Sequence, residues 1–358
     1  MTKQWAKLPR YFMRAAFVCA MAASAASAAQ TPERYPWDNR PLKCFAPGAF
    51  TVGSCTPIDN WPDQSQSIQR IVLLYNSGNF ALLERALAEL EASDKRFVWG
   101  SPQEAVWYAF GRIMYPGVQP VELERVAQWR KAVPNSIFVP FAEARYAYTF
   151  AWNARGMGYA SSVSDESWEL FAIRLQQAEQ MLLKAPKLLK DTTLWHHLLL
   201  GISLDSNRVQ SKPAEVFDHA VKRFPRYFPF YETMAERLLP KWGGSWEKVE
   251  AFVSGSSRLL EATEGKSMYA RLYISLLRCC ATPDQTRMNW TLMKESFDDL
   301  IVRYPDPIYK NLYASYACAL KDKPAFSNAM ARIPPGEMRP ESWLDGNSYD
   351  SCLRWGGT

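Results

Sequence analysis

Apolar residues recur at helical spacing along most of the chain, from residue 64 onward. Two stretches illustrate the pattern, one with Phe80, Leu83, Leu87 and Leu90 on a single face, the other with Trp168, Phe171, Leu175, Ala178 and Leu182. Apolar and polar residues do not alternate in a sustained way anywhere, as they would along half-buried strands. The pattern therefore predicts an all-α protein.

The predicted helices come in pairs, and the pairs recur. In "IVLLYNSGNFALLERALAEL", residues 71–90, a tight turn over residues 76–79 joins two helices with apolar faces. Prolines at positions 134, 186, 225 and 305 each separate one pair from the next, at intervals of 52, 39 and 80 residues, the last being about two units of 40. Units of this size are typical of tetratricopeptide-like α-solenoids, in which antiparallel helical hairpins stack into a superhelix. We expect one helical repeat domain over residues 64–335 and a C-terminal tail over residues 336–358.

Two segments interrupt the helical pattern more than a simple turn requires. In "ARGMGYASSVSDESWELF", residues 154–171, two glycines can end a helix, and Ser164 with the acidic pair after it can start the next. In "LLPKWGGSWEKVEAF", residues 238–252, Pro240 and two glycines make a sharp turn, and Ser245 can cap the helix that follows. In the first segment these roles leave Arg155, Tyr159 and the Ser161–Ser162 pair unexplained. We predict that four residues of the two segments lie near a binding surface: Arg155, Tyr159, Lys241 and Trp242. The alternative for Trp242 is an aromatic contact that locks two hairpins together.

The N-terminus has the pattern of a secretory signal peptide. Four basic residues (Lys3, Lys7, Arg10 and Arg14) flank or precede an apolar run that ends in small residues, so residues 1–29 are expected to be removed on export. The run is shorter than the roughly 20 residues that span a bilayer, so no integral membrane segment is expected after cleavage. Removal of the four basic residues lowers the formal net charge from +6 to +2, which gives no reason to expect nucleic acid as a partner. We expect a bacterial protein that is periplasmic or secreted.

Six cysteines remain after the leader is removed, and an exported protein can form disulfides. Cys44 and Cys55 are the first expected pair, within an irregular segment over residues 30–63. Cys318 and Cys352 could tie the tail to the last helices, but the adjacent Cys279 and Cys280 leave that pairing open.

Residues with catalytic or metal-binding chemistry are scarce. The three histidines are His196, His197 and His219, and none has a metal-site partner at helical spacing, so neither a metal nor a cofactor is expected. Adjacent helical residues face about 100° apart, so we expect one of His196 and His197 to be packed and the other solvated. Ser245 and Lys248 form an isolated S-x-x-K pattern without its companion motifs, which favours a helix cap over a nucleophile. No catalytic motif is recognisable.

The two interrupting segments carry a resemblance to a known family. "WNARGMGYASSVSDESWELFAIRLQQAEQML" (residues 152–182) and "HAVKRFPRYFPFYETMAERLLPKWGGSWEKVEAFV" (residues 219–253) resemble the bacterial domain of unknown function family 4034, a TPR-like helical family. The resemblance covers about a third of the chain and implies the same stacking of helical hairpins. It supplies no catalytic residues.

These features favour an exported scaffold that binds a protein or peptide in the bacterial envelope, since stacked hairpins provide an extended concave surface. One alternative is an immunity-type protein that neutralises an exported toxin. Another is a hydrolase of an envelope polymer, which would need two facing carboxylates in a deep cleft. Asp165 and Glu166 are not that pair, because a helix start explains both.

Overall fold

The fold was examined in a computed structural model, which describes residues 64–93, 97, 100–115, 117–118, 120–344 and 348–357, without the side chains of residues 278–280 and 348. These residues form sixteen α-helices and five short 3₁₀ helices, and no strand occurs among them. The prediction of an all-α protein is confirmed. The predicted signal peptide, the segment over residues 30–63 and the expected Cys44–Cys55 pair lie outside the described residues.

The first helices are α2 (Gln64–Asn76), α3 (Phe80–Ala92), α4 (Pro102–Ile113) and α5 (Pro120–Ala132). Helix α4 packs against α2 and α3, and it also contacts α9 (Thr193–Asp205). Partly buried Glu91 of α3 joins this group to α9 as well, because its carboxylate accepts hydrogen bonds from the Thr193 amide (3.2 Å) and hydroxyl (3.1 Å). The N-terminal helices are thus fixed to a helix about a hundred residues further along the chain.

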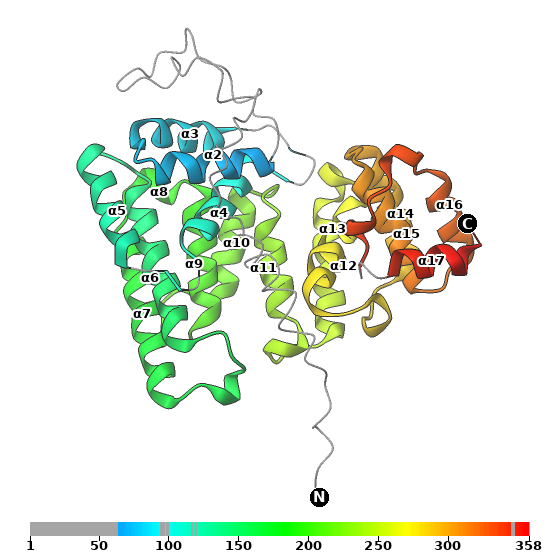
Figure 1. The fold of residues 1–358 in the computed structure, drawn as a ribbon. Helices are drawn as coiled ribbons and strands as arrows, with labels where there is room; N and C mark the ends of the chain where they lie inside the picture. The colour runs from blue at the N-terminus through cyan, green and yellow to red at the C-terminus, as the bar shows by residue number, and fades with distance from the viewer. Residues whose placement is uncertain are drawn as a thin grey trace, which may run out of the picture. The chain divides into compact units, whose positions relative to one another are not determined.

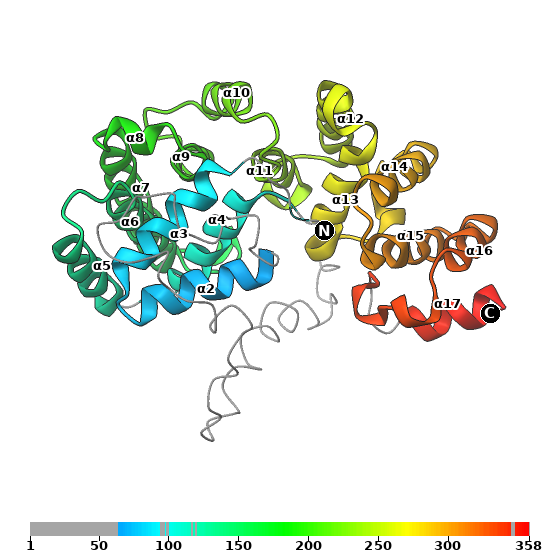
Figure 2. The same ribbon diagram turned by 90° about the horizontal axis from the view of Figure 1, so that it is seen from above.

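Antiparallel hairpins make up the rest of the stack. The hairpins are α6 (Val139–Arg155) with α7 (Asp165–Leu183), α9 with α10 (Pro213–Arg223), α11 (Pro229–Arg237) with α12 (Trp246–Glu264), α13 (Ser267–Cys280) with α14 (Trp290–Arg303), and α15 (Pro307–Ala319) with α16 (Lys323–Ala331). Short α8 (Lys187–Lys190) precedes α9, and α17 (Ser348–Gly356) follows the last hairpin. Helices α6 and α7 run side by side over most of their length (Figure 1), and successive hairpins follow one another in chain order (Figure 2). Neighbours in sequence are neighbours in space, as in a helical solenoid.

The hairpins begin at intervals of 36 to 54 residues, close to the predicted unit. Pro186, Pro225 and Pro305 each lie between the second helix of one hairpin and the first helix of the next, and Pro134 lies between α5 and α6. The 80-residue interval spans two units because the boundary between α12 and α13 has Gly265 instead of a proline. Its φ of +55° turns the chain in the left-handed region, which glycine adopts without strain.

The two interrupting segments have the local structure that their residues predict. Helix α6 ends at Gly156 with φ +75°, and the Ser164 side chain caps α7 by accepting a hydrogen bond from the Ser167 amide. Gly243 has φ +83°, and Ser245 caps α12 in the same way through the Lys248 amide. Both segments are joints between stacked helices.

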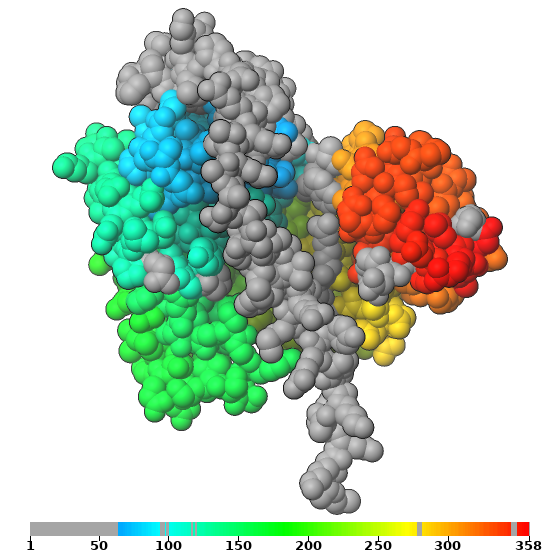
Figure 3. Space-filling model, viewed as in Figure 1, coloured from blue at the N-terminus to red at the C-terminus, as the bar shows by residue number. Residues whose placement is uncertain are grey.

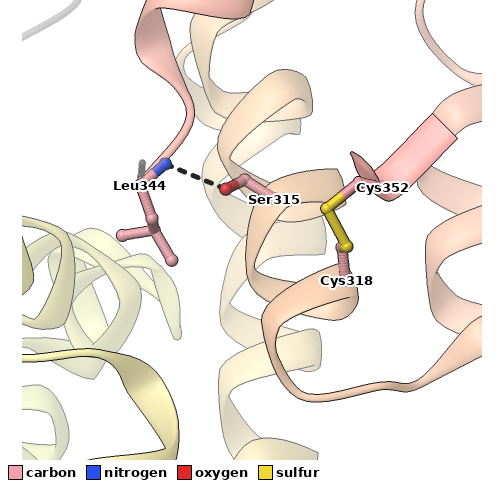
Figure 4. The surroundings of a disulfide bond; sticks show 4 residues. All are labelled: Ser315, Cys318, Leu344 and Cys352. Atoms are coloured by element: carbon pink, nitrogen blue, oxygen red, sulfur yellow. Dashed lines mark hydrogen bonds between the residues drawn. A yellow bond between two sulfur atoms is a disulfide. The ribbon is translucent and has the colours of Figure 1, made fainter. Parts of the chain in front are cut away.

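A disulfide attaches the C-terminal residues to the stack. Cys318 of α15 is bonded to Cys352 of α17, with Cα atoms 5.8 Å apart, which settles one pairing that the sequence left open. The Leu344 amide also donates a 3.0 Å hydrogen bond to the Ser315 hydroxyl of α15 (Figure 4). In the space-filling view the red C-terminal residues lie directly on the orange surface of the preceding helices (Figure 3). None of the helices in the described part of the chain has the length and apolarity needed to cross a bilayer.

Candidate functional site

A cavity of about 270 Å³ opens where α4, α6, α9 and α11 meet. Four aromatic side chains line it: Trp107, Tyr148, Trp152 and Trp242. The remaining lining residues are His197, Gly201, Leu204, Asp205, Thr233, Glu236 and Arg237. We call this set the Asp205 cavity. Three of its helices, α6, α9 and α11, are the first helices of successive hairpins.

Asp205, at the end of α9, is the centre of the hydrogen-bond network in this cavity. Its buried carboxylate accepts hydrogen bonds from the Tyr148 hydroxyl (2.8 Å) and the Trp152 indole nitrogen (3.0 Å). It also forms an ion pair with Arg237 of α11. Burial raises the pKa of Asp205, while Arg237 and the donated hydrogen bonds act in the opposite direction. The carboxylate therefore joins three consecutive hairpins.

Arg155 lies in the same network, although it is almost completely buried. Its guanidinium donates hydrogen bonds to the carbonyl oxygens of Gly156 (3.0 Å) and Gly158 (3.2 Å), which holds the joint after α6. It is also stacked between two indole rings, with centroids 5.1 Å (Trp152) and 4.8 Å (Trp168) away. Burial lowers the pKa of Arg155, and the charge of Asp205 raises it. Arg155 thus braces the joint from inside.

The other three predicted site residues are exposed. Trp242 lines the cavity with its ring 4.7 Å from the guanidinium carbon of Arg237. Lys241 lies beside that ring and forms a 2.9 Å ion pair with Glu236, another lining residue. Tyr159 is 83% exposed in the loop after α6 and is not part of the cavity lining. The structure thus connects the two interrupting segments through Arg155, Asp205, Arg237 and Trp242, while Tyr159 lies apart.

Both adjacent histidines are buried, so the prediction that one would be solvated is wrong. The His197 ring stacks on Trp107 at 3.7 Å, and its nitrogens lie 3.0 Å from the hydroxyls of Tyr227 and Thr233. Burial lowers the pKa of His197 well below its ordinary value, and Arg145 lowers it further, so the ring is neutral at pH 7. His196 faces α10 instead, where it contacts His219 at 3.1 Å. Helix α9 is covered on several sides by α4, α6, α7, α10 and α11, which leaves no solvated face for either ring.

Arg145 of α6 is a residue that the sequence reasoning missed. Its guanidinium carbon lies 4.5 Å from the Trp107 ring centroid and 5.5 Å from the Tyr148 ring centroid, and both rings line the cavity. Its Nε is completely buried and has no hydrogen-bond acceptor among the residues that the structure describes. The helical spacing in the sequence could have identified Arg145, because it lies on the same face of the helix as Tyr148, Trp152 and Arg155.

A second cavity of about 420 Å³ lies near the ends of α12 and α14. Buried Glu264 lines it, accepting a 2.6 Å hydrogen bond from the Tyr304 hydroxyl and pairing with Arg226 at 3.4 Å. Arg303, also in the lining, is held by Asp299. The ionic groups of this cavity neutralise one another. Within the described residues, no cluster of three or more His, Cys, Asp or Glu side chains is arranged to hold a metal ion.

Comparison with known proteins adds no functional assignment to this geometry. The resemblance to the domain of unknown function family 4034 stays a prediction, whereas the all-α repeat architecture rests on the structure itself. No family model, curated protein or solved structure matches the chain.

Proposed function

We propose that the protein is an exported scaffold that binds a segment of another protein or a peptide, and that the Asp205 cavity receives one side chain or chain end of that partner. The observation that carries the proposal is the position of the cavity, since its walls come from the first helices of three successive hairpins. In stacked-hairpin proteins such helices form a continuous binding surface. A cavity with four aromatic walls and a few fixed polar groups is typical of a binding pocket.

The polar groups of the Asp205 cavity fit a binding site better than the active site of a hydrolase. Asp205 and Glu236 both line the cavity, so two carboxylates are present in one cleft. However, Asp205 already accepts hydrogen bonds from three donors, and Glu236 is paired with Lys241. Neither carboxylate is placed to take a proton from a water molecule, which a general base must do.

The Cys318–Cys352 disulfide supports export. Disulfides form and persist in the bacterial periplasm and outside the cell, and they are rare in reducing compartments. A periplasmic or secreted location would agree with the leader-like N-terminus and would limit the partners to proteins and peptides of the envelope.

Selection from a displayed library of random peptides tests the proposal. Peptides enriched on the wild-type protein are expected to lose binding to Trp242→Ala, which removes one wall of the cavity. Phe150→Ala is a matched control, because Phe150 is about as exposed as Trp242 but does not line the cavity. The proposal fails if the selected peptides bind Trp242→Ala as tightly as the wild type, or if Phe150→Ala weakens them equally.

A further inference from the structure

Among the described residues, Arg145 has no counter-ion. The described groups near it include the rings of Trp107, Tyr148 and His197 and the phenol of Tyr227, and none of these carries a negative charge at neutral pH. Its buried Nε lacks an acceptor. The side chain is partly buried, and ring stacking replaces only part of the hydration that the cation loses there.

The other arginines of the region show how this cost is normally avoided. Arg237 pairs with the carboxylate of Asp205, and Arg155 donates to two backbone carbonyl oxygens. Arg145 is the exception among these three. Buried polar groups without a partner are uncommon, and a ligand that supplies the partner is one recurring reason for them.

Cations outnumber carboxylates among the charged groups that line the cavity or lie directly against a lining residue. Four cations lie in its wall or directly against a wall residue, namely Arg145, Arg155, Arg237 and Lys241, and its lining contains two carboxylates, Asp205 and Glu236. The region is therefore positive, while the aromatic walls suit an apolar group.

We infer that the Asp205 cavity selects a partner segment that carries a carboxylate next to an aromatic or large apolar side chain, with Arg145 as the counter-ion of that carboxylate. The inference rests on the proposed function and specifies its ligand. The carboxylate could belong to the end of a chain or to a Glu or Asp side chain, and the probes below separate these two sources.

Two pairs of synthetic peptides test the inference on the full chain by isothermal titration calorimetry. The first pair is acetyl-Gly-Gly-Phe with a free terminal carboxylate and the same peptide as an amide. The second pair is acetyl-Gly-Glu-Phe-Gly-amide and its Gln counterpart. In one pair or both, the charged member is expected to bind on the order of tenfold more tightly, because a charge-assisted hydrogen bond forms only with the carboxylate.

Variants of Arg145 test whether this residue causes the preference for the charged peptides. Arg145→Gln and Arg145→Met are expected to abolish it, and Arg145→Lys to keep part of it, since lysine retains the charge but not the planar fork. Cooperative melting transitions at or above the temperature of the wild type would establish that the variants fold. Equal binding of charged and neutral peptides to the wild type, or full preference in Arg145→Gln, would overturn the inference alone. If neither member of either pair binds the wild type, the inference is overturned as well, while the proposed function is decided by the peptide selection.

Discussion

The helices around the Asp205 cavity and the helices α15–α17 both bury polar groups, but they satisfy them differently. In α15, the amide of fully buried Asn311 donates to the carbonyl oxygens of Pro307 and Glu337 and accepts a hydrogen bond from the Arg339 amide. Arg145, beside the cavity, has a buried Nε without an acceptor. A buried polar group with all its partners, such as Asn311, stabilises the fold, whereas an unmatched charge makes the cavity region a candidate for recognition.

The largest predicted effect comes from removal of the Cys318–Cys352 disulfide, which lies in the region of α15–α17. Replacement of Cys318 and Cys352 by alanine removes a cross-link across 34 residues, and the free energy of unfolding should fall by about 4 kcal/mol on the chain-entropy estimate. Urea unfolding followed by circular dichroism measures the loss, and reduction of the wild type should reproduce it. Binding of cavity-selected peptides should not change. A parallel loss of that binding would show that the two regions are not separable.

A smaller effect should come from the contact between α3 and the cavity helix α9. Burial raises the pKa of Glu91 to about 8, and the hydrogen bonds from Thr193 only partly oppose this shift. The folded state therefore keeps a proton that the unfolded chain releases near its ordinary pKa of 4.5, so stability should fall as the pH rises from about 4.5 to 8.

Glu91→Gln cannot ionise and should lose this component of the pH dependence. Because Glu91 retains some solvent access, we expect the variant to gain on the order of 2 kcal/mol over the wild type between pH 5 and pH 9. Melting temperatures of both proteins across this range measure the gain. If the melting temperatures of the two proteins change with pH in parallel, Glu91 is ionised in the folded protein at neutral pH.

The smallest predicted effect is an increase in the free energy of unfolding, whereas most mutations lower it. Arg145→Met keeps the packing of the side-chain stem against Trp107 but removes the unmatched charge, so the free energy of unfolding should rise by about 1 kcal/mol. Arg237→Met is the matched control, since it removes the cation from an existing pair and should destabilise the protein by about 2 kcal/mol. Thermal unfolding of both variants makes the comparison, and a loss of stability in Arg145→Met would indicate a structural role.

The parts of the structure that depend on neighbouring residues could be predicted from the sequence. The end of α6 at Gly156 and the caps at Ser164 and Ser245 follow from local backbone preferences. The repeat length follows from the prolines, although Gly265 replaces one of them because a positive φ turns the chain equally well. The C-terminal pairing stayed open because connectivity depends on distances in the folded chain.

The cavity could be predicted only in part, because it is made by residues distant in sequence. Arg155 and Trp242 drew attention as residues that capping did not explain, and they lie on either side of Asp205. Asp205 itself is an ordinary acidic residue at the end of a helix, and only the tertiary structure gives it three donors. The burial of both His196 and His197 likewise depends on how many helices surround α9.

The bonds to Asp205 also bear on the curvature of the stack. Tyr148 and Trp152 reach this carboxylate from α6, and Arg237 reaches it from α11, so the angle between three successive hairpins is fixed at one point. In stacked-hairpin proteins, small rotations between units set the bend of the whole array. Because Trp152 and Trp242 contact the two members of the Asp205–Arg237 pair, a change in the angle between these hairpins would also change the width of the cavity.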